Sequence, residues 1–383
     1  MSASRATVLA GIPSENPALY HRVRFAVGDP AAWLSLSING QLRSEFIVRD
    51  IEMQRARQVV KVDRVSCPAD YAPAGGLSGD RATATAQAVA ECLVRAGVSH
   101  VTTDRTLPFI FAWFIQQAGL SLEYSAELGV IDRRVKDEQE LQWLAQAQQV
   151  TEAAMLMACQ TVAQAKANAA GELVHEGQVL TSQGLRKRIS QYLLDRDYAN
   201  PHDAIVASLP HSADCHDRGS GPLKTGQAVI IDIFPRSLAT NYWGDCTRTV
   251  VHGDPSDEVV AMHAAVVAAK QAATGAARAG TTADLVHAAT KNALAAHGYE
   301  FQRGAIADAP IMSHGTGHGI GLEVHEPILL DDNGGTLMAG EVFTIEPGLY
   351  SRQHGGVRVE DMVVITAGLP RNLNTLHEGL GWE

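Results

Sequence analysis

The sequence predicts an α/β (α+β) protein with more than one domain, and three observations support this prediction. A chain of 383 residues usually forms two or three domains. Strand-like and helix-like patterns follow one another within the first 130 residues, as in a small α/β domain. A charged junction at 131–139 leads into a long helical pattern. We therefore expect an N-terminal domain over 1–130, a linker over 131–139 and a larger C-terminal domain over 140–383.

Composition excludes several classes of function. Apolar residues make up 46% and charged residues 19%, which is typical of a globular core. A net charge of −11 without a long basic run disfavours nucleic acids and anionic membranes as partners. No apolar run approaches twenty residues, and the N-terminus lacks a long apolar segment. Five cysteines without a CxxC pair indicate a reducing compartment, so we expect a cytoplasmic protein.

The N-terminal part carries local patterns but no chemical motif. Residues 1–30 show no regular pattern and are expected to be irregular. A hairpin is predicted at 32–48, because Asn39-Gly40 favours a two-residue turn. The elements expected after it are helix 50–60, loop 66–81, helix 82–97, strand 98–103 and helix 107–118. Since no dinucleotide or phosphate-loop signature occurs, this part indicates no function by itself.

The C-terminal part combines long helical patterns with short apolar strands. Helices are expected at about 137–167, 181–197, 255–278 and 282–297. Strands are expected at 204–208, 227–234, 240–251, 341–346 and 356–366.

Four acidic residues lie within these apolar strand patterns: Asp232, Asp245, Glu346 and Glu360. Desolvating an ionised carboxylate costs several kcal/mol unless it has a partner. A salt bridge to arginine would explain any one of them alone, whereas four together need a shared cation. Two divalent ions would balance four carboxylates and lower the pKa of a bound water. An oxygen-rich site with one imidazole suits Mn²⁺, with Zn²⁺ or Co²⁺ as alternatives.

The segment 312–326 places three histidines, His314, His318 and His325, in a glycine-rich frame. A single such histidine would be explained by a flexible, solvated loop. Three together, followed by acid-bearing strands, are candidates for metal binding or proton transfer. His318 and His325 are seven residues apart, which allows one to reach a metal and the other to lie across a substrate pocket. Arg358 and Glu360 are two residues apart on one expected strand, so their side chains should point to the same face.

These motifs resemble the pita-bread metallopeptidases, which comprise methionine aminopeptidases, Xaa-Pro aminopeptidases, prolidases and creatinase. The resemblance covers 135–383 and rests on the patterns IDI, GDCTRT, GHGIGLEVHE, TIEPG and VRVED. It implies a pita-bread catalytic domain with two divalent ions. The metal ligands that it implies are Asp232, Asp245, His318, Glu346 and Glu360, with Asp245 and Glu360 bridging both ions.

The same resemblance implies roles around the metals. Glu346 matches the acid/base residue, and His216 and His325 match groups that stabilise the tetrahedral intermediate. His216, His314, His325 and Arg358 match residues that hold the substrate. The chain departs from the family pattern in the longer spacing from Asp232 to Asp245 and in Leu209, His211 and Cys215, which alter the lip of the pocket.

The N-terminal part narrows the resemblance to the Xaa-Pro branch. Methionine aminopeptidases generally lack such an α/β domain, and creatinase, which has it, lacks the metal carboxylates. The resemblance thus implies a creatinase-like N-terminal domain, a homodimer, and hydrolysis of Xaa-Pro dipeptides through a metal-bridging hydroxide. Three alternatives remain open: an Xaa-Pro aminopeptidase acting on longer peptides, a non-catalytic binding protein, and a metallohydrolase of phosphoryl esters.

Overall fold

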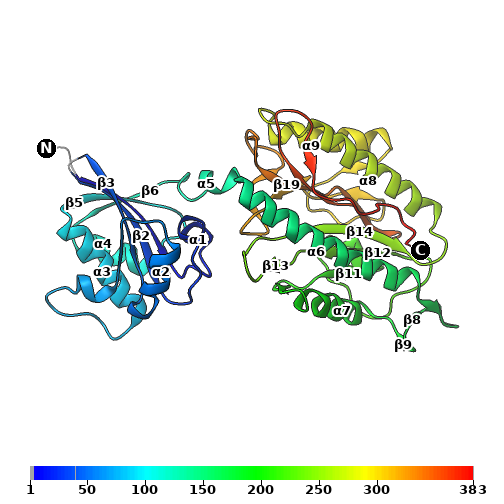
Figure 1. Cartoon of the computed structure of the whole chain (residues 1–383). Helices are drawn as coiled ribbons and strands as arrows, with labels where there is room; N and C mark the ends of the chain where they lie inside the picture. Colours follow the sequence, from blue (N-terminus) through cyan, green and yellow to red (C-terminus); the bar gives the residue numbers. More distant parts are fainter. Residues whose placement is uncertain (1–3, 39, 383) are drawn as a thin grey trace. The chain divides into compact units, whose positions relative to one another are not determined.

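The computed structural model describes residues 4–38 and 40–382, and the chain divides into two compact units, 1–133 and 134–383 (Figure 1). Both units combine helices with sheets, so the predicted α/β class is confirmed. In the described part of the chain, no helix has the length and apolarity needed to cross a membrane.

The N-terminal unit is built on a mixed six-stranded sheet with the order β4-β3-β2-β1-β5-β6. Its strands are β1 Ser4–Gly11, β2 Ala31–Ile38, β3 Gln41–Ile47, β4 Arg64–Ser66, β5 Val98–Thr103 and β6 Ser121–Tyr124. Its helices are α1 Pro17–Val23, α2 Met53–Val59, α3 Arg81–Arg95 and α4 Phe109–Gln117, with short 3₁₀ turns at Asp50–Glu52 and Pro68–Tyr71. Successive strand residues point to opposite faces. Val8 therefore packs with α3 and α4, and Leu9 packs with α1 and α2.

The expectation for residues 1–30 was wrong, and the one for the hairpin was largely right. Strand β1 and helix α1 occupy the segment expected to be irregular. The start of α1 carries a readable signal, because Asn16 caps the N–H of Leu19 and Pro17 stands at the first helical position. Strands β2 and β3 pair antiparallel from Ala32↔Ile47 to Ile38↔Gln41. Asn39 of the predicted turn lies outside the described residues.

The larger unit holds three main sheets with long helices packed against them (Figure 1). Its helices are α6 Glu138–Ala163, α7 Ser182–Leu194, α8 Asp257–Ala276 and α9 Ala283–Ala296. The short helix α5 Ile131–Arg134 crosses the boundary between the two units in the sequence. Three sheets carry the site residues. The first consists of β11 Ile205–Ala207, β12 Ala228–Ile233 and β14 Cys246–Val251. The second consists of β18 Glu326–Leu330, β17 Gly317–Gly319, β19 Val342–Ile345, β22 Asp361–Val364 and β23 Arg371–Asn372, and the third of β15 Glu300–Phe301, β16 Ile311–Met312, β20 Gly348–Ser351 and β21 Gly355–Arg358. The remaining short elements are β7 Lys166–Ala167, β8 Leu173–His175, β9 Gln178–Val179, β10 Tyr198–Ala199, β13 Arg236–Ser237 and a 3₁₀ turn at His211–Ala213.

The helices bury their apolar faces on these sheets. Helix α6 starts at a capping box in which Asp137 and Glu140 exchange side chain to backbone hydrogen bonds, close to the start expected from the sequence. Helices α6 and α7 cover β11, β12 and β14, while α8 and α9 share a second core with β19 and β22. The inner surfaces of the sheets remain available for polar groups.

Two predicted strands are shorter than expected. The strand expected over 240–251 begins only at Cys246, so Asp245 precedes it. The strand expected over 356–366 is two strands, β21 and β22, which are separated at Val359-Glu360. The cause is that these backbones turn toward other elements: the N–H of Asp245 donates to Gln148 Oε1 of α6, and the N–H of Glu360 donates to the carbonyl of Thr247.

Candidate metal centre

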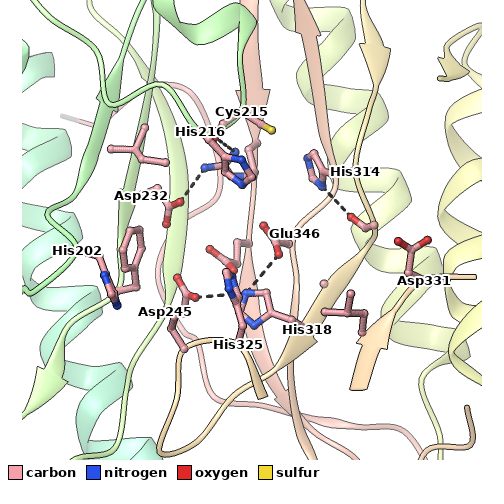
Figure 2. Close-up of a pocket in the computed structure, with 18 residues that line it drawn as sticks. His202, Cys215, His216, Asp232, Asp245, His314, His318, His325, Asp331 and Glu346 are labelled. Atoms are coloured by element: carbon pink, nitrogen blue, oxygen red, sulfur yellow. Dashed lines mark hydrogen bonds and ion pairs between the residues drawn. The ribbon is translucent and has the colours of Figure 1, made fainter. Parts of the chain in front are cut away.

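The residues predicted to bind metal converge on one cavity of about 620 Å³ in the larger unit (Figure 2). Asp232 lies on β12, His318 on β17, and the other three lie where strands begin or end. All five line the cavity: Asp232, Asp245, His318, Glu346 and Glu360. His216, His314, His325 and Arg358 line it as well. The fold thus brings together the residues that the sequence singled out.

The candidate ligand atoms at the centre of the cavity lie close to one another. Candidate ligand atoms of Asp245, His318 and Glu360 all lie within 4.8 Å of one another. His318 Nε2 is 3.7 Å from Asp245 Oδ2 and 3.5 Å from Glu346 Oε1, as the dashed lines in Figure 2 mark. Asp232 Oδ1 is buried and has no hydrogen-bond partner. Such an atom is costly in a protein interior unless a cation binds it.

The local electrostatics favour a bound cation. Burial, followed by repulsion from Glu360, raises the pKa of Asp245 well above its usual value. Burial, followed by repulsion from Glu346, does the same to the pKa of Glu360. Burial raises the pKa of Glu346 to about 7. Burial lowers the pKa of His318 to about 3, so its imidazole is neutral and can act as a ligand. Divalent ions would relieve the repulsion between the carboxylates, and the donor set fits them.

Close contact between strands places His318 opposite Glu346. A Cβ atom on Gly317 would lie 2.0 Å from the carbonyl oxygen of Thr344, so only glycine permits this approach of β17 to β19. The N–H of His318 donates to Thr344 Oγ1, and the N–H of Glu346 donates to the carbonyl of Thr316. The glycine-rich frame of the histidine segment therefore serves close packing.

Arg358 is buried, and its guanidinium group donates hydrogen bonds to several protein groups. It donates to Asp232 Oδ2 at 2.7 Å, to Tyr350 Oη at 2.9 Å and to Thr247 Oγ1 at 3.2 Å. It also donates to the carbonyl of Cys215. These contacts orient the carboxylate of Asp232.

The three remaining histidines differ in their surroundings. His314 has both ring nitrogens engaged, Nδ1 with the carbonyl of Gly315 and Nε2 with Tyr350 Oη. His325 packs edge-on against His318 with ring centroids 4.2 Å apart, and burial lowers its pKa. His216 lies in the loop after the His211–Ala213 turn and is exposed within the cavity. Of these three histidines, His216 and His325 are exposed, whereas His314 is partly buried.

The cavity also contains residues that the sequence did not single out. His202 lies on the side of Asp232, and Asp331 lies on the opposite side with His314 (Figure 2). His202 stacks on Trp243 with ring centroids 5.4 Å apart and an interplanar angle of 13°. Ile205, Phe234 and Leu329 also line the cavity, together with Gly315, Gly317 and Val324 of the histidine segment. Most lie in loops or short strands, where no local pattern marks a residue as part of a pocket.

Two cysteines, Cys215 and Cys246, lie beside candidate site residues in the sequence. Cys246 is buried, whereas Cys215 is only partly buried and lines the cavity. Burial raises the pKa of both thiols, so neither is activated as a thiolate.

Comparison with known proteins agrees with this geometry. "Probable dipeptidase PepE" of Mycobacterium tuberculosis strain H37Rv is 36% identical over 180 residues, which is 46% of this chain and 45% of that protein. The chain thus matches about half the length of this curated relative. An Xaa-Pro dipeptidase of Pyrococcus horikoshii is 29% identical over 280 residues, 70% of this chain and 71% of that protein.

Solved structures show the same fold. The X-Pro aminopeptidase of Thermotoga maritima has a TM-score of 0.78 and 24% identity, with 98% of this chain and 97% of that chain covered. This likeness supports the predicted pita-bread fold with its N-terminal domain. The family model of metallopeptidase family M24 matches residues 142–367, which is more than half of the sequence and contains all five candidate metal ligands. The chain belongs to metallopeptidase family M24.

Proposed function

We propose that this protein is a dinuclear metal-dependent exopeptidase that hydrolyses Xaa-Pro dipeptides. The observation that carries the proposal is the meeting of four carboxylates and a neutral imidazole at the cavity, with Asp232 Oδ1 buried and unpaired. Asp232, Asp245, His318, Glu346 and Glu360 would hold two divalent ions, for which Mn²⁺ suits the oxygen-rich set. When bound, the ions supply Lewis acidity and lower the pKa of water at the site.

The arrangement of the cavity suggests how a dipeptide lies in it. We place the substrate amino group beside Asp232 and Asp245. These carboxylates attract a basic nitrogen, and they would also hold an ion to which that nitrogen can bind. The residue before proline then lies toward His202, and the proline lies toward His314 and Asp331, on the two sides seen in Figure 2. The scissile bond falls near Glu346 and His325.

The chain's own residues would then move protons and bind the developing oxyanion. Glu346 takes a proton from the attacking water and returns it to the leaving proline nitrogen. This transfer is needed because the proline nitrogen leaves as a neutral amine and not as an anion. His216 and His325 donate hydrogen bonds to the carbonyl oxygen as its negative charge develops. Arg358 pairs with Asp232 and orients its carboxylate.

Relatives support the substrate class, since the similar Pyrococcus protein carries the name Xaa-Pro dipeptidase. The five cysteines are unpaired thiols, which supports a cytoplasmic location. We also propose a homodimer, on the basis of the family resemblance alone.

The test is an assay of Gly-Pro and of a Gly-Pro-Xaa tripeptide with Mn²⁺, with Zn²⁺ and with EDTA. The wild type and Glu300→Gln, an exposed control, should cleave the dipeptide with metal and lose activity with EDTA. Glu346→Gln should be inactive. Cleavage of the tripeptide as well would favour an aminopeptidase over a dipeptidase. A metal-loaded protein that cleaves neither peptide would refute the proposed substrate.

A further inference from the structure

We infer that Lys136 is a positioning residue for the active site. Lys136 lies in the segment just before α6, and its ion pair with Glu326 fixes the turn that carries His325. Lys136 lies in the charged junction that the sequence suggested as a linker. In the structure the larger unit begins at Arg134, so Lys136 belongs to it. The inference rests on the proposed function, since its main measurement is peptide hydrolysis.

The contact itself is a buried ion pair. Lys136 Nζ lies 2.8 Å from Glu326 Oε2, and the two side chains are 3% and 2% exposed. A buried charge pair of this kind is costly to break by removing one partner. The backbone N–H of Lys136 also donates to the carbonyl of Gly340, which fixes the place from which the lysine reaches.

Glu326 transmits this constraint to the active site. It follows His325 directly in the chain and is paired with Gly319, the residue after His318, in the β17–β18 ladder. Its second oxygen, Oε1, accepts the N–H of Leu322 at 2.9 Å, so the carboxylate bridges the turn 319–326 from inside. A Cβ on Gly321 would lie 2.7 Å from Glu326 Oε2, which shows how closely the turn wraps this group.

His325 is the residue that this turn presents to the cavity, and its ring packs against that of His318. Lys136 and Glu326 are absent from the cavity wall. They therefore act through the position of His325, and displacement by about 1 Å can cost about a hundredfold in rate.

A second ion pair in the same segment provides a matched control. Arg134 pairs with Glu341, and their side chains are 12% and 2% exposed. Arg134 also donates to the carbonyl of Thr336. This pair anchors the same stretch of backbone but contacts no part of the His325 turn, so its loss should leave catalysis unchanged.

The first experiment separates positioning from stability. Lys136→Met alone should lower Tm, because Glu326 loses the buried cation that lies 2.8 Å from its Oε2. The double variant Lys136→Met with Glu326→Gln removes both charges and keeps an acceptor for Leu322. We expect it to recover most of the lost Tm and to keep full metal content. Its kcat for the Xaa-Pro dipeptide should still fall about tenfold or more. Arg134→Met with Glu341→Gln should stay within about twofold of the wild type. Recovery of kcat together with Tm would overturn the inference.

The second experiment tests whether the effect passes through His325. His325→Ala is combined with the Lys136/Glu326 double variant, and the effects on kcat/KM are compared. If the pair acts through His325, kcat/KM of the combined variant should lie within about twofold of that of His325→Ala. Multiplied effects would show that the pair acts elsewhere and would overturn the inference.

A third measurement keeps the inference separate from the proposed substrate. Side-chain NMR of histidine-labelled protein, assigned with His325→Ala, should show the His325 signal shifted in the Lys136/Glu326 variant and unchanged in the Arg134/Glu341 variant. If the wild type cleaves no Xaa-Pro peptide, the proposed function fails while this shift still decides the inference. An unshifted His325 signal would refute it.

Discussion

The stability of the metal-free protein should fall as the pH rises through the range in which Glu346 titrates. In the folded protein, burial raises the pKa of this carboxyl from 4.5 to about 7. Between these values the folded state binds a proton that the unfolded state releases, so the stabilisation is complete below pH 4.5 and is lost by about pH 7. The difference corresponds to about 3 kcal/mol of unfolding free energy. The raised pKa values of Asp245 and Glu360 act in the same direction.

The assay is urea unfolding in EDTA at several pH values between 5 and 8, with the wild type and Glu346→Gln compared at each. The variant should lose less stability over this range, by an amount on the order of 3 kcal/mol. Glu300→Gln, an exposed site on β15, should follow the wild type. Saturating Mn²⁺ should remove the fall, because the ions need the carboxylates deprotonated. Parallel curves for the wild type and Glu346→Gln would refute the electrostatic reasoning.

Two further predictions concern the frame around the metals. Gly317→Ala should destabilise the protein by about 3 kcal/mol and abolish metal retention, because its Cβ would meet the carbonyl of Thr344 at 2.0 Å. Urea unfolding and metal analysis check this. The control is Gly275→Ala inside α8, where a Cβ meets open space; it should keep its metal and be no less stable than the wild type. Arg358→Met should cost about 3–5 kcal/mol at pH 8, because it leaves Asp232 buried without its counter-ion. Equal stability of this variant at pH 8 would contradict the role given to the ion pair.

The sequence predicted the composition of the site better than its geometry. Asp232 was recognisable because a carboxylate inside an apolar strand demands a partner. Glu360 was expected inside one long strand, yet the strand is interrupted there because the N–H of Glu360 donates to the carbonyl of Thr247. The two residues are far apart in sequence, so no local pattern could indicate this contact. His202 and Asp331 line the cavity from outside the predicted motifs, and only tertiary packing brings them to it.

The same limit applies to the first residues of the chain. Strand β1 pairs with β2 and β5, and both partners are distant in sequence. Its own residues carry a mixed pattern because both faces of the sheet are covered, by α3 and α4 on one side and by α1 and α2 on the other. A strand covered on both faces lacks the alternation of polar and apolar residues by which half-buried strands are recognised.

The ion pairs of the segment before α6 have a consequence for protein engineering. Arg134 and Lys136 are anchored in the larger unit by Glu341 and Glu326, so residues from Arg134 onward fold as part of that unit. A chimera that exchanges the N-terminal domain for another should therefore place its crossover before Arg134. A crossover a few residues later, inside the charged stretch that resembles a linker, would import foreign side chains into two buried ion pairs.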